Sequence, residues 1–160
     1  MFEDDDDNDE SFEDYEKRQE NVRQMPIFLK GKEIVEVVRQ LVDLIPEENE
    51  LLNSVKGLLI EDAFTLTAKI VNAEASDLYD LKMENAAIIR KAARDLMVQN
   101  HTLKEFGFEH IAYFQIVRNL LEEYRLLFID WVATFDINNY IVDRWGLFNP
   151  PGVSPFDKEY

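Results

Sequence analysis

The chain contains no cysteine, and its 160 residues include only two histidines and five glycines. Without thiols it cannot form disulfides, thiolate zinc sites, iron–sulfur clusters or a cysteine nucleophile. The five glycines stand alone in the sequence, so no glycine-rich loop can cradle a phosphate. These absences predict a protein without a bound cofactor, and the lack of cysteine favours a cytoplasmic location.

Long apolar segments are missing as well. The longest, such as LLFIDWVATF, are interrupted by charge and are too short to span a bilayer. The N-terminal stretch MFEDDDDNDESFEDYE is acidic, whereas a secretory signal needs a basic start followed by an apolar run. We therefore expect a soluble protein that stays in the cytoplasm and has no membrane partner.

The residues that usually carry catalysis are too few or wrongly spaced. A di-iron helical bundle needs Glu-x-x-His repeats, but Val98 and Gly107 stand three residues before His101 and His110. No serine lies in a G-x-S-x-G context, and neither histidine has an evident serine partner. The sequence thus predicts no metal site, no catalytic residue and no enzymatic activity.

Acidic residues dominate the charge, which is −16 in total. Residues 1–20 carry 11 acidic and 2 basic side chains, and the other 140 residues carry 22 acidic and 15 basic ones. More than half of the net charge therefore lies in one short N-terminal segment. Such a field repels nucleic acids and anionic membranes and favours basic partners.

Residues 1–24 are expected to be a disordered acidic arm, because a block of like charges cannot bury enough apolar surface to offset its ordering entropy. Phe2, Phe12 and Tyr15 interrupt the acidic run at intervals. The arm is then either a solubilising tail or a short docking motif that binds a partner through these aromatic residues.

Four segments place apolar residues at spacings of three and four, which is typical of amphipathic helices. Pro26 suits a first helical turn, Pro46 ends the first pattern, and Gly57 is expected to mark a close approach between helices. We predict an all-α, antiparallel up-and-down four-helix bundle over residues 25–135. The four helices are expected at about 26–45, 48–73, 77–99 and 108–135.

The last of these segments is apolar around much of its circumference, so we expect it to contact more than its own bundle. After it, Asp136 is expected to cap a short fifth helix over residues 137–145. The chain then ends in an extended, proline-rich tail, so that residues 136–160 form a C-terminal strap. Its candidate partner-binding residues are Trp145, Leu147, Phe148 and Phe156.

Two interpretations of the strap remain open at this point. It folds back over the wide fourth helix of its own bundle, or it docks on a neighbouring subunit or another protein in an extended conformation.

A basic cluster stands on the third predicted helix, where Arg90 and Arg94 share a face and Lys91 lies beside them. These residues either complement the helix dipole or contact phosphates of a nucleic acid. Other charged residues lie next to apolar positions, and we expect them to form ion pairs between helices. They include Asp62, Lys69, Glu84, Glu123 and Asp130.

Residues 28–135 resemble the bacterial four-helix bundle family related to the product of the intervening sequence in 23S ribosomal RNA genes. This family includes the accessory protein of diversity-generating retroelements. The resemblance lies in the first helix KGKEIVEVVRQLVDLIP, in TAKIVNAEA at the end of the second, and in LKEFGF between the third and fourth. It implies a non-enzymatic bundle that forms homo-oligomers. Some members are basic and contact nucleic acid, whereas this bundle is acidic.

These observations together favour a non-enzymatic interaction or scaffold protein. We expect it to self-associate and to bind a protein partner through the acidic arm, the fourth helix or the strap. The alternative is a nucleic-acid-associated accessory factor that uses Arg90, Lys91 and Arg94.

Overall fold

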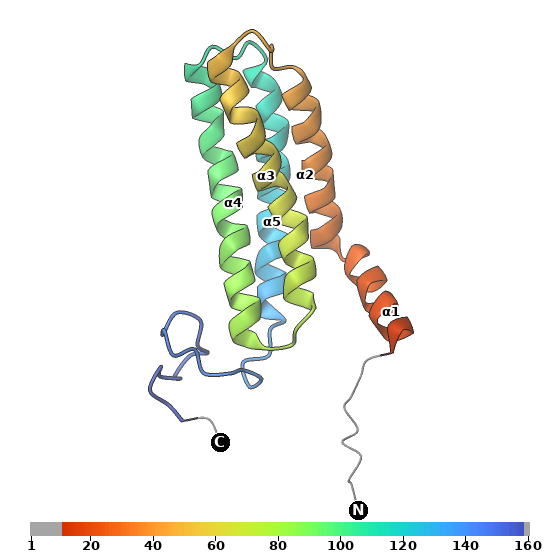
Figure 1. Ribbon diagram of the computed structural model, residues 1–160, viewed down its shortest axis with the longest axis vertical. Helices are drawn as coiled ribbons and strands as arrows, with labels where there is room; N and C mark the ends of the chain where they lie inside the picture. The colour runs from red at the N-terminus through yellow and green to blue at the C-terminus, as the bar shows by residue number, and fades with distance from the viewer. Residues whose placement is uncertain (1–10, 159–160) are drawn as a thin grey trace, which may run out of the picture.

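A computed structural model of the chain describes residues 11–158, and these form helices and turns without any strand. Four long helices run alternately up and down, side by side (Figure 1), so the predicted all-α bundle is confirmed. A further helix, α1, precedes them, and a short 3-10 helix, η1, leads into the last one. The elements are α1 (Phe12–Arg23), α2 (Pro26–Asp43), α3 (Glu50–Glu74), α4 (Tyr79–Glu105), η1 (Ile111–Tyr113) and α5 (Phe114–Ala133).

The bundle helices begin and end where local chemistry satisfies their free backbone groups. The Asn49 side chain caps α3 by accepting a hydrogen bond from the Leu52 N–H at 3.0 Å. Helix α4 continues to Glu105, past the polar link expected at about residue 100. Just after its end, Gly107 has a φ of 80°, which lets the Phe108 N–H bond to a carbonyl of the last turn.

The core lies along the axis of the bundle and is apolar throughout. Each long helix contributes one stripe of buried side chains, and each such side chain stabilises the fold by about 1.5–3 kcal/mol. The central members, none of which is measurably exposed, are Ile34, Leu41, Leu59, Leu66, Ile70, Ile89, Leu96, Phe114 and Val117.

Helices α2, α3 and α5 meet at the backbone carbonyl of Leu66. The buried Tyr124 hydroxyl of α5 donates to this oxygen at 2.8 Å, and burial raises the pKa of Tyr124. On the other side lies Gly31 of α2, where a Cβ atom would come within 3.0 Å of the same oxygen and of the Thr67 methyl group. The expectation for Gly57 was wrong, because Gly57 is exposed and has open space around it.

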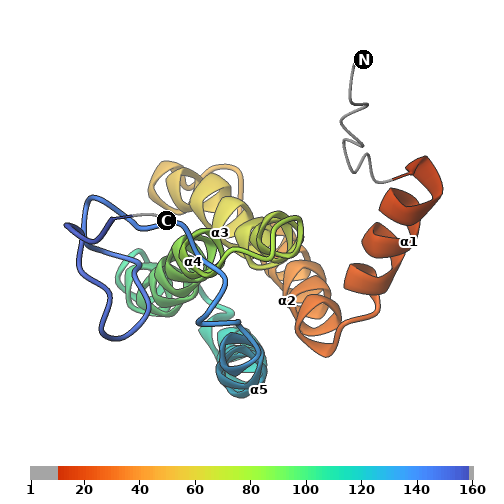
Figure 2. The ribbon, with the colours of Figure 1, turned by 90° about the horizontal axis from the view of Figure 1, so that it is seen from below.

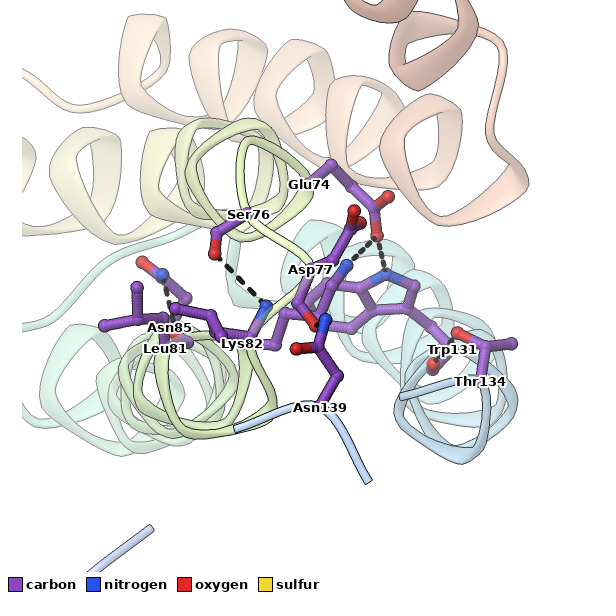
Figure 3. A network of polar contacts seen from close by, with 10 residues as sticks. Glu74, Ser76, Asp77, Leu81, Lys82, Asn85, Trp131, Thr134 and Asn139 are labelled. Carbon is purple, nitrogen blue, oxygen red and sulfur yellow. Dashed lines mark hydrogen bonds and ion pairs between the residues drawn. The ribbon is translucent and has the colours of Figure 1, made fainter. Parts of the chain in front are cut away.

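A polar network closes the end of the bundle where α3 stops and α4 starts (Figure 3). The Glu74 carboxylate accepts a hydrogen bond from the Trp131 indole at 2.8 Å and pairs with the Lys82 ammonium at 3.2 Å. Lys82 is buried and also lies 5.3 Å from the centre of the Phe135 ring. Because the three polar residues belong to α3, α4 and α5, the network ties three helices together.

Helix α1 occupies much of the segment that the sequence predicts to be disordered. The Ser11 hydroxyl accepts a hydrogen bond from the Asp14 N–H at 3.2 Å, and acidic residues in the first turn suit the helix dipole. At the other end Val22 is buried against the bundle. These contacts explain the helix, which leaves the bundle beside α2, on the side away from α4 (Figures 1 and 2).

Residues 137–145 form turns and irregular backbone in place of the expected fifth helix. The reason is local, because Asp136 accepts from the Asn138 N–H at 2.9 Å and so closes a turn. The chain then follows the first turn of α4, where Asn139 accepts from the Tyr79 N–H at 2.7 Å. The strap therefore folds back at the start of α4 and not over α5, the wide fourth helix of the bundle.

The contact at Leu66 predicts opposite effects for the same substitution at two glycines. Gly31→Ala should lower the free energy of unfolding by about 1 kcal/mol, because overpacking against a backbone carbonyl outweighs the gain in helix propensity. Gly57→Ala is the matched control and should raise the free energy of unfolding by up to about 1 kcal/mol. Urea denaturation of both variants measures the difference, and a stabilised Gly31→Ala would contradict the close packing.

The network around Glu74 predicts strongly non-additive effects on stability. Glu74→Gln should lower the free energy of unfolding by about 2 kcal/mol, because it leaves the buried Lys82 without a counter-charge. Adding Lys82→Met should recover much of the lost stability, since the double variant leaves no unpaired buried charge. A double-mutant cycle by thermal denaturation measures the coupling, and simply additive losses would show that the pair is not coupled.

Candidate functional site: a groove between α4 and α5

Helices α4 and α5 contact each other least among the neighbouring pairs of the bundle. Helix α3 packs closely against both α2 and α4, and α5 packs mainly against α2. Seen along the bundle, α5 stands apart from α4 (Figure 2). Between them lies an open groove of about 560 Å³, which we call the α4/α5 groove.

The floor of the α4/α5 groove is apolar. Tyr124, whose hydroxyl is fixed to the carbonyl of Leu66, contributes its ring to this floor. Met97 and Ile129 remain partly exposed, with 38% and 51% of their surface accessible. The groove therefore exposes a hydrophobic surface to solvent. Its other apolar lining residues are Ile89, Ala93, Val98, Leu121 and Phe128.

Four arginines surround this floor, Arg90 and Arg94 from α4 and Arg118 and Arg125 from α5. Arg125 pairs with Glu122, the one acidic residue in the lining, at 2.5 Å, and this hydrogen bond lowers the pKa of Glu122. The other three arginines form no ion pair with any residue in the described part of the chain. The groove is therefore locally basic in a strongly acidic protein.

The structure divides the basic cluster that the sequence indicates. Arg90 and Arg94 line the groove, whereas Lys91 points elsewhere and pairs with Asp95 at 2.6 Å. The sequence analysis missed Arg118 and Arg125. Their spacing of seven residues, which is two helical turns, was the signal that places them on one face of α5.

Of the aromatic residues predicted in the acidic arm, the structure describes two, and neither lines the groove of its own chain. Phe12 and Tyr15 belong to α1 and are 74% and 50% exposed. Phe2 lies outside the residues that the structure describes. Helix α1 makes its close contacts with α2 and α3 and none with α4 or α5.

Hydrogen bonds within the strap organise the turn around Asp143. The Asp143 carboxylate accepts from the N–H groups of Trp145, Leu147 and Phe148 at 2.8–3.0 Å, which lowers the pKa of Asp143. Trp145 is 90% exposed and Leu147 75%, while Phe148 is half-buried. Phe156, also 90% exposed, lies farther along. The four predicted strap residues therefore differ in exposure, from the half-buried Phe148 to the almost fully exposed Trp145 and Phe156.

The carboxylates outside the groove show no arrangement suited to metal binding. Within residues 11–158, no three or more His, Cys, Asp or Glu side chains are grouped so that they could hold a metal ion. Of the charged residues expected to pair between helices, Glu123 does so with Lys30 of α2 at 3.0 Å. Burial, and next the charge of Asp95, raise the pKa of Asp62 to about 6.

The raised pKa of Asp62 predicts how stability depends on pH. The folded protein holds this proton more tightly than the unfolded chain, so the ionised carboxylate destabilises the fold increasingly from about pH 4 to about pH 6. Asp62→Asn should raise the free energy of unfolding at about pH 7 by roughly 1 kcal/mol, a value reduced for solvent screening. Asp130→Asn, at an exposed position of α5, controls for the lost charge.

Urea denaturation at about pH 4 and about pH 7 measures this effect. The stability difference between the two pH values should shrink in Asp62→Asn and persist in Asp130→Asn. An equal pH dependence in all three proteins would show that Asp62 titrates at its ordinary pKa.

Comparisons with known proteins do not place the chain in a family. No protein-family model, no curated protein and no solved structure matches it. The relationship to the family of the 23S intervening-sequence product therefore stays a prediction. Among the described helices, none combines the length and the apolar character needed to cross a membrane.

Proposed function

We propose that this protein is a non-enzymatic interaction module that binds a segment of a protein in the α4/α5 groove. The observation that carries the proposal is an apolar floor lined by four arginines, three of which have no ion-pair partner within residues 11–158. Amphipathic helices bind in such grooves, with their apolar face on the floor and their polar edges at the rim.

The residue types in the groove support a protein ligand. Arginine, methionine and aromatic residues are enriched in protein–protein interfaces, and lysine is depleted. The lining contains four arginines, together with Met97, Tyr124 and Phe128, and has no lysine. Its volume also falls in the range of small-molecule pockets, but its open, extended form along two helices suits a longer ligand.

The polar groups of the groove give no support to an enzymatic function. A general acid–base mechanism needs a group that titrates near neutral pH within reach of the substrate. Arginine stays protonated, and the single carboxylate, Glu122, is paired with Arg125. The lining contains neither histidine nor a hydroxyl nucleophile apart from the phenol of Tyr124, which is buried and hydrogen-bonded.

A second candidate, an accessory factor that contacts nucleic acid, is favoured by one observation. Arg118 and Arg125 of α5 line the groove together with Arg90 and Arg94, so four basic side chains gather there. Four phosphate contacts would make binding strongly salt-dependent. The apolar floor between the arginines and the net charge of −16 favour the protein ligand instead.

Two substitutions on α5 test the protein-binding proposal. Ile129→Asp should abolish capture of the partner, because it places a charge in the apolar floor of the groove. Leu126→Asp is the matched control, since Leu126 is exposed to a similar degree (54% against 51%) but lies outside the groove. Capture by the tagged full-length chain from a lysate, with and without nuclease, measures both effects.

Equal capture by the two variants would show that the groove is not the binding surface. Loss of capture on nuclease treatment would favour the nucleic-acid candidate. In that case Arg94→Glu should weaken binding, and binding should fall steeply as salt rises.

A further inference from the structure

We infer that the α4/α5 groove selects one class of ligand, an amphipathic helix of another protein that carries acidic side chains along both edges of its apolar face. The inference rests on the proposed function and names the chemistry of its partner. Three features of the groove lead to it: the length of its floor, the scarcity of free hydrogen-bond acceptors in its lining, and the positions of its unpaired arginines.

The floor of the groove has the length of a short helix. Its lining runs from Ile89 to Val98 on α4 and from Arg118 to Ile129 on α5. At a rise of about 1.5 Å per residue, these stretches extend roughly 14 Å and roughly 17 Å along the bundle. A ligand helix of about three turns covers that distance. Such a helix would bury exposed side chains of both walls, among them Met97 and Ile129.

The polar groups of the lining favour a helix over an extended peptide. An extended ligand carries free backbone N–H groups, which cost free energy when they are buried without an acceptor. The four arginines of the lining can only donate. Of its oxygen atoms, the Glu122 carboxylate pairs with Arg125, and the buried Tyr124 hydroxyl is bonded to the backbone of α3. A helix satisfies its own backbone groups except at its ends, so it needs no acceptor from the groove.

Three arginines determine where the ligand needs acidic residues. Arg90 and Arg94 of α4 stand one helical turn apart, about 6 Å along the axis. Arg118 lies on the opposite wall, near the start of α5 and therefore toward the end where the chain connects α4 to α5. None of the three forms an ion pair within residues 11–158. The ligand therefore needs two acidic residues one turn apart on its edge facing α4, and a third on its other edge.

Two neighbouring acidic residues leave the positive charge of the groove in place. The lining itself contains four arginines and one glutamate, a net charge of +3 in a chain of −16. Asp95, next to Arg94 in the chain, pairs with Lys91 at 2.6 Å. Glu123 pairs with Lys30 of α2 at 3.0 Å. An acidic ligand would therefore meet opposite charge in the groove, whereas a basic ligand would be repelled.

Glu122 competes with the ligand for the fourth arginine. It pairs with Arg125 at 2.5 Å, and both side chains belong to the lining. An acidic ligand would have to displace this carboxylate before it could bind Arg125. The pair thus makes the α5 wall less positive than the α4 wall, where both arginines are free, and the more acidic edge of the ligand is expected to face α4.

Binding of designed peptides to the full-length chain tests the inference. The probe is a fluorescent peptide of about four turns, with leucine on one face and glutamate along both edges. A second peptide carries lysine in place of each glutamate, and a third has proline at its centre, which breaks a helix. Fluorescence anisotropy should find that the lysine peptide binds about tenfold more weakly than the acidic one, or worse. The proline peptide should not bind.

Three single variants test whether the arginines of the groove cause this preference. Arg94→Glu should weaken binding of the acidic peptide and strengthen binding of the lysine peptide, a gain that a misfolded chain would not give. Glu122→Gln should strengthen binding of the acidic peptide, because it frees Arg125. Arg144→Glu, at an exposed position of the strap, changes the net charge as Arg94→Glu does and should leave both affinities unchanged.

The inference is wrong if the acidic peptide does not bind, if both charged peptides bind equally, or if Arg94→Glu changes neither affinity. If Ile129→Asp nevertheless abolishes capture from a lysate, the proposed function stands and only the chemistry of the ligand is wrong. If Ile129→Asp changes neither capture nor peptide binding, the proposed function fails as well.

Two further measurements address other occupants of the groove. A fluorescent single-stranded oligonucleotide that binds more tightly than the acidic peptide would overturn the inference in favour of nucleic acid. Sedimentation velocity tests for a second copy of the chain. Self-association that Ile129→Asp abolishes would place that copy in the groove and would also overturn the inference.

Discussion

The carbonyl of Leu66 sets the positions of three helices. Because Gly31 has no side chain, α2 approaches α3 closely at this point, and Tyr124 of α5 reaches the same oxygen from the other side. A buried hydroxyl that lost this acceptor would cost about 1–3 kcal/mol, so α5 is held near α2 and α3. Helix α4 packs mainly on α3. Helices α4 and α5, which follow each other in the chain, therefore make few contacts with each other.

The α4/α5 groove is a consequence of this arrangement. At one end of the bundle Glu74, Lys82 and Trp131 join α3, α4 and α5, and at the other end the chain itself links α4 to α5. Between these two ends some apolar side chains of α4 and α5, such as Met97, Val98 and Ile129, remain exposed. Side chains that a closed bundle would bury therefore remain accessible, and four arginines line the same groove.

The sequence predicts the four bundle helices well, because apolar spacing and the prolines are local signals that burial then reinforces. It does not predict α1, because the high net charge of this segment indicates disorder. In the structure the Ser11 cap and the burial of Val22 stabilise a helix there. It also misses the groove, whose existence depends on how far α4 and α5 diverge. Periodicity tells which face of a helix is apolar, but it does not tell whether another helix covers that face.

The two tryptophans lie in opposite environments, which gives the molecule two separate optical reporters. Trp131 is buried and donates to Glu74 at the closed end of the bundle, whereas Trp145 stands almost fully in solvent on the turn organised by Asp143. An indole shielded from water emits at shorter wavelengths and resists collisional quenchers. An exposed indole emits at longer wavelengths and is readily quenched. Fluorescence therefore distinguishes opening of the bundle from events at the strap without any added label.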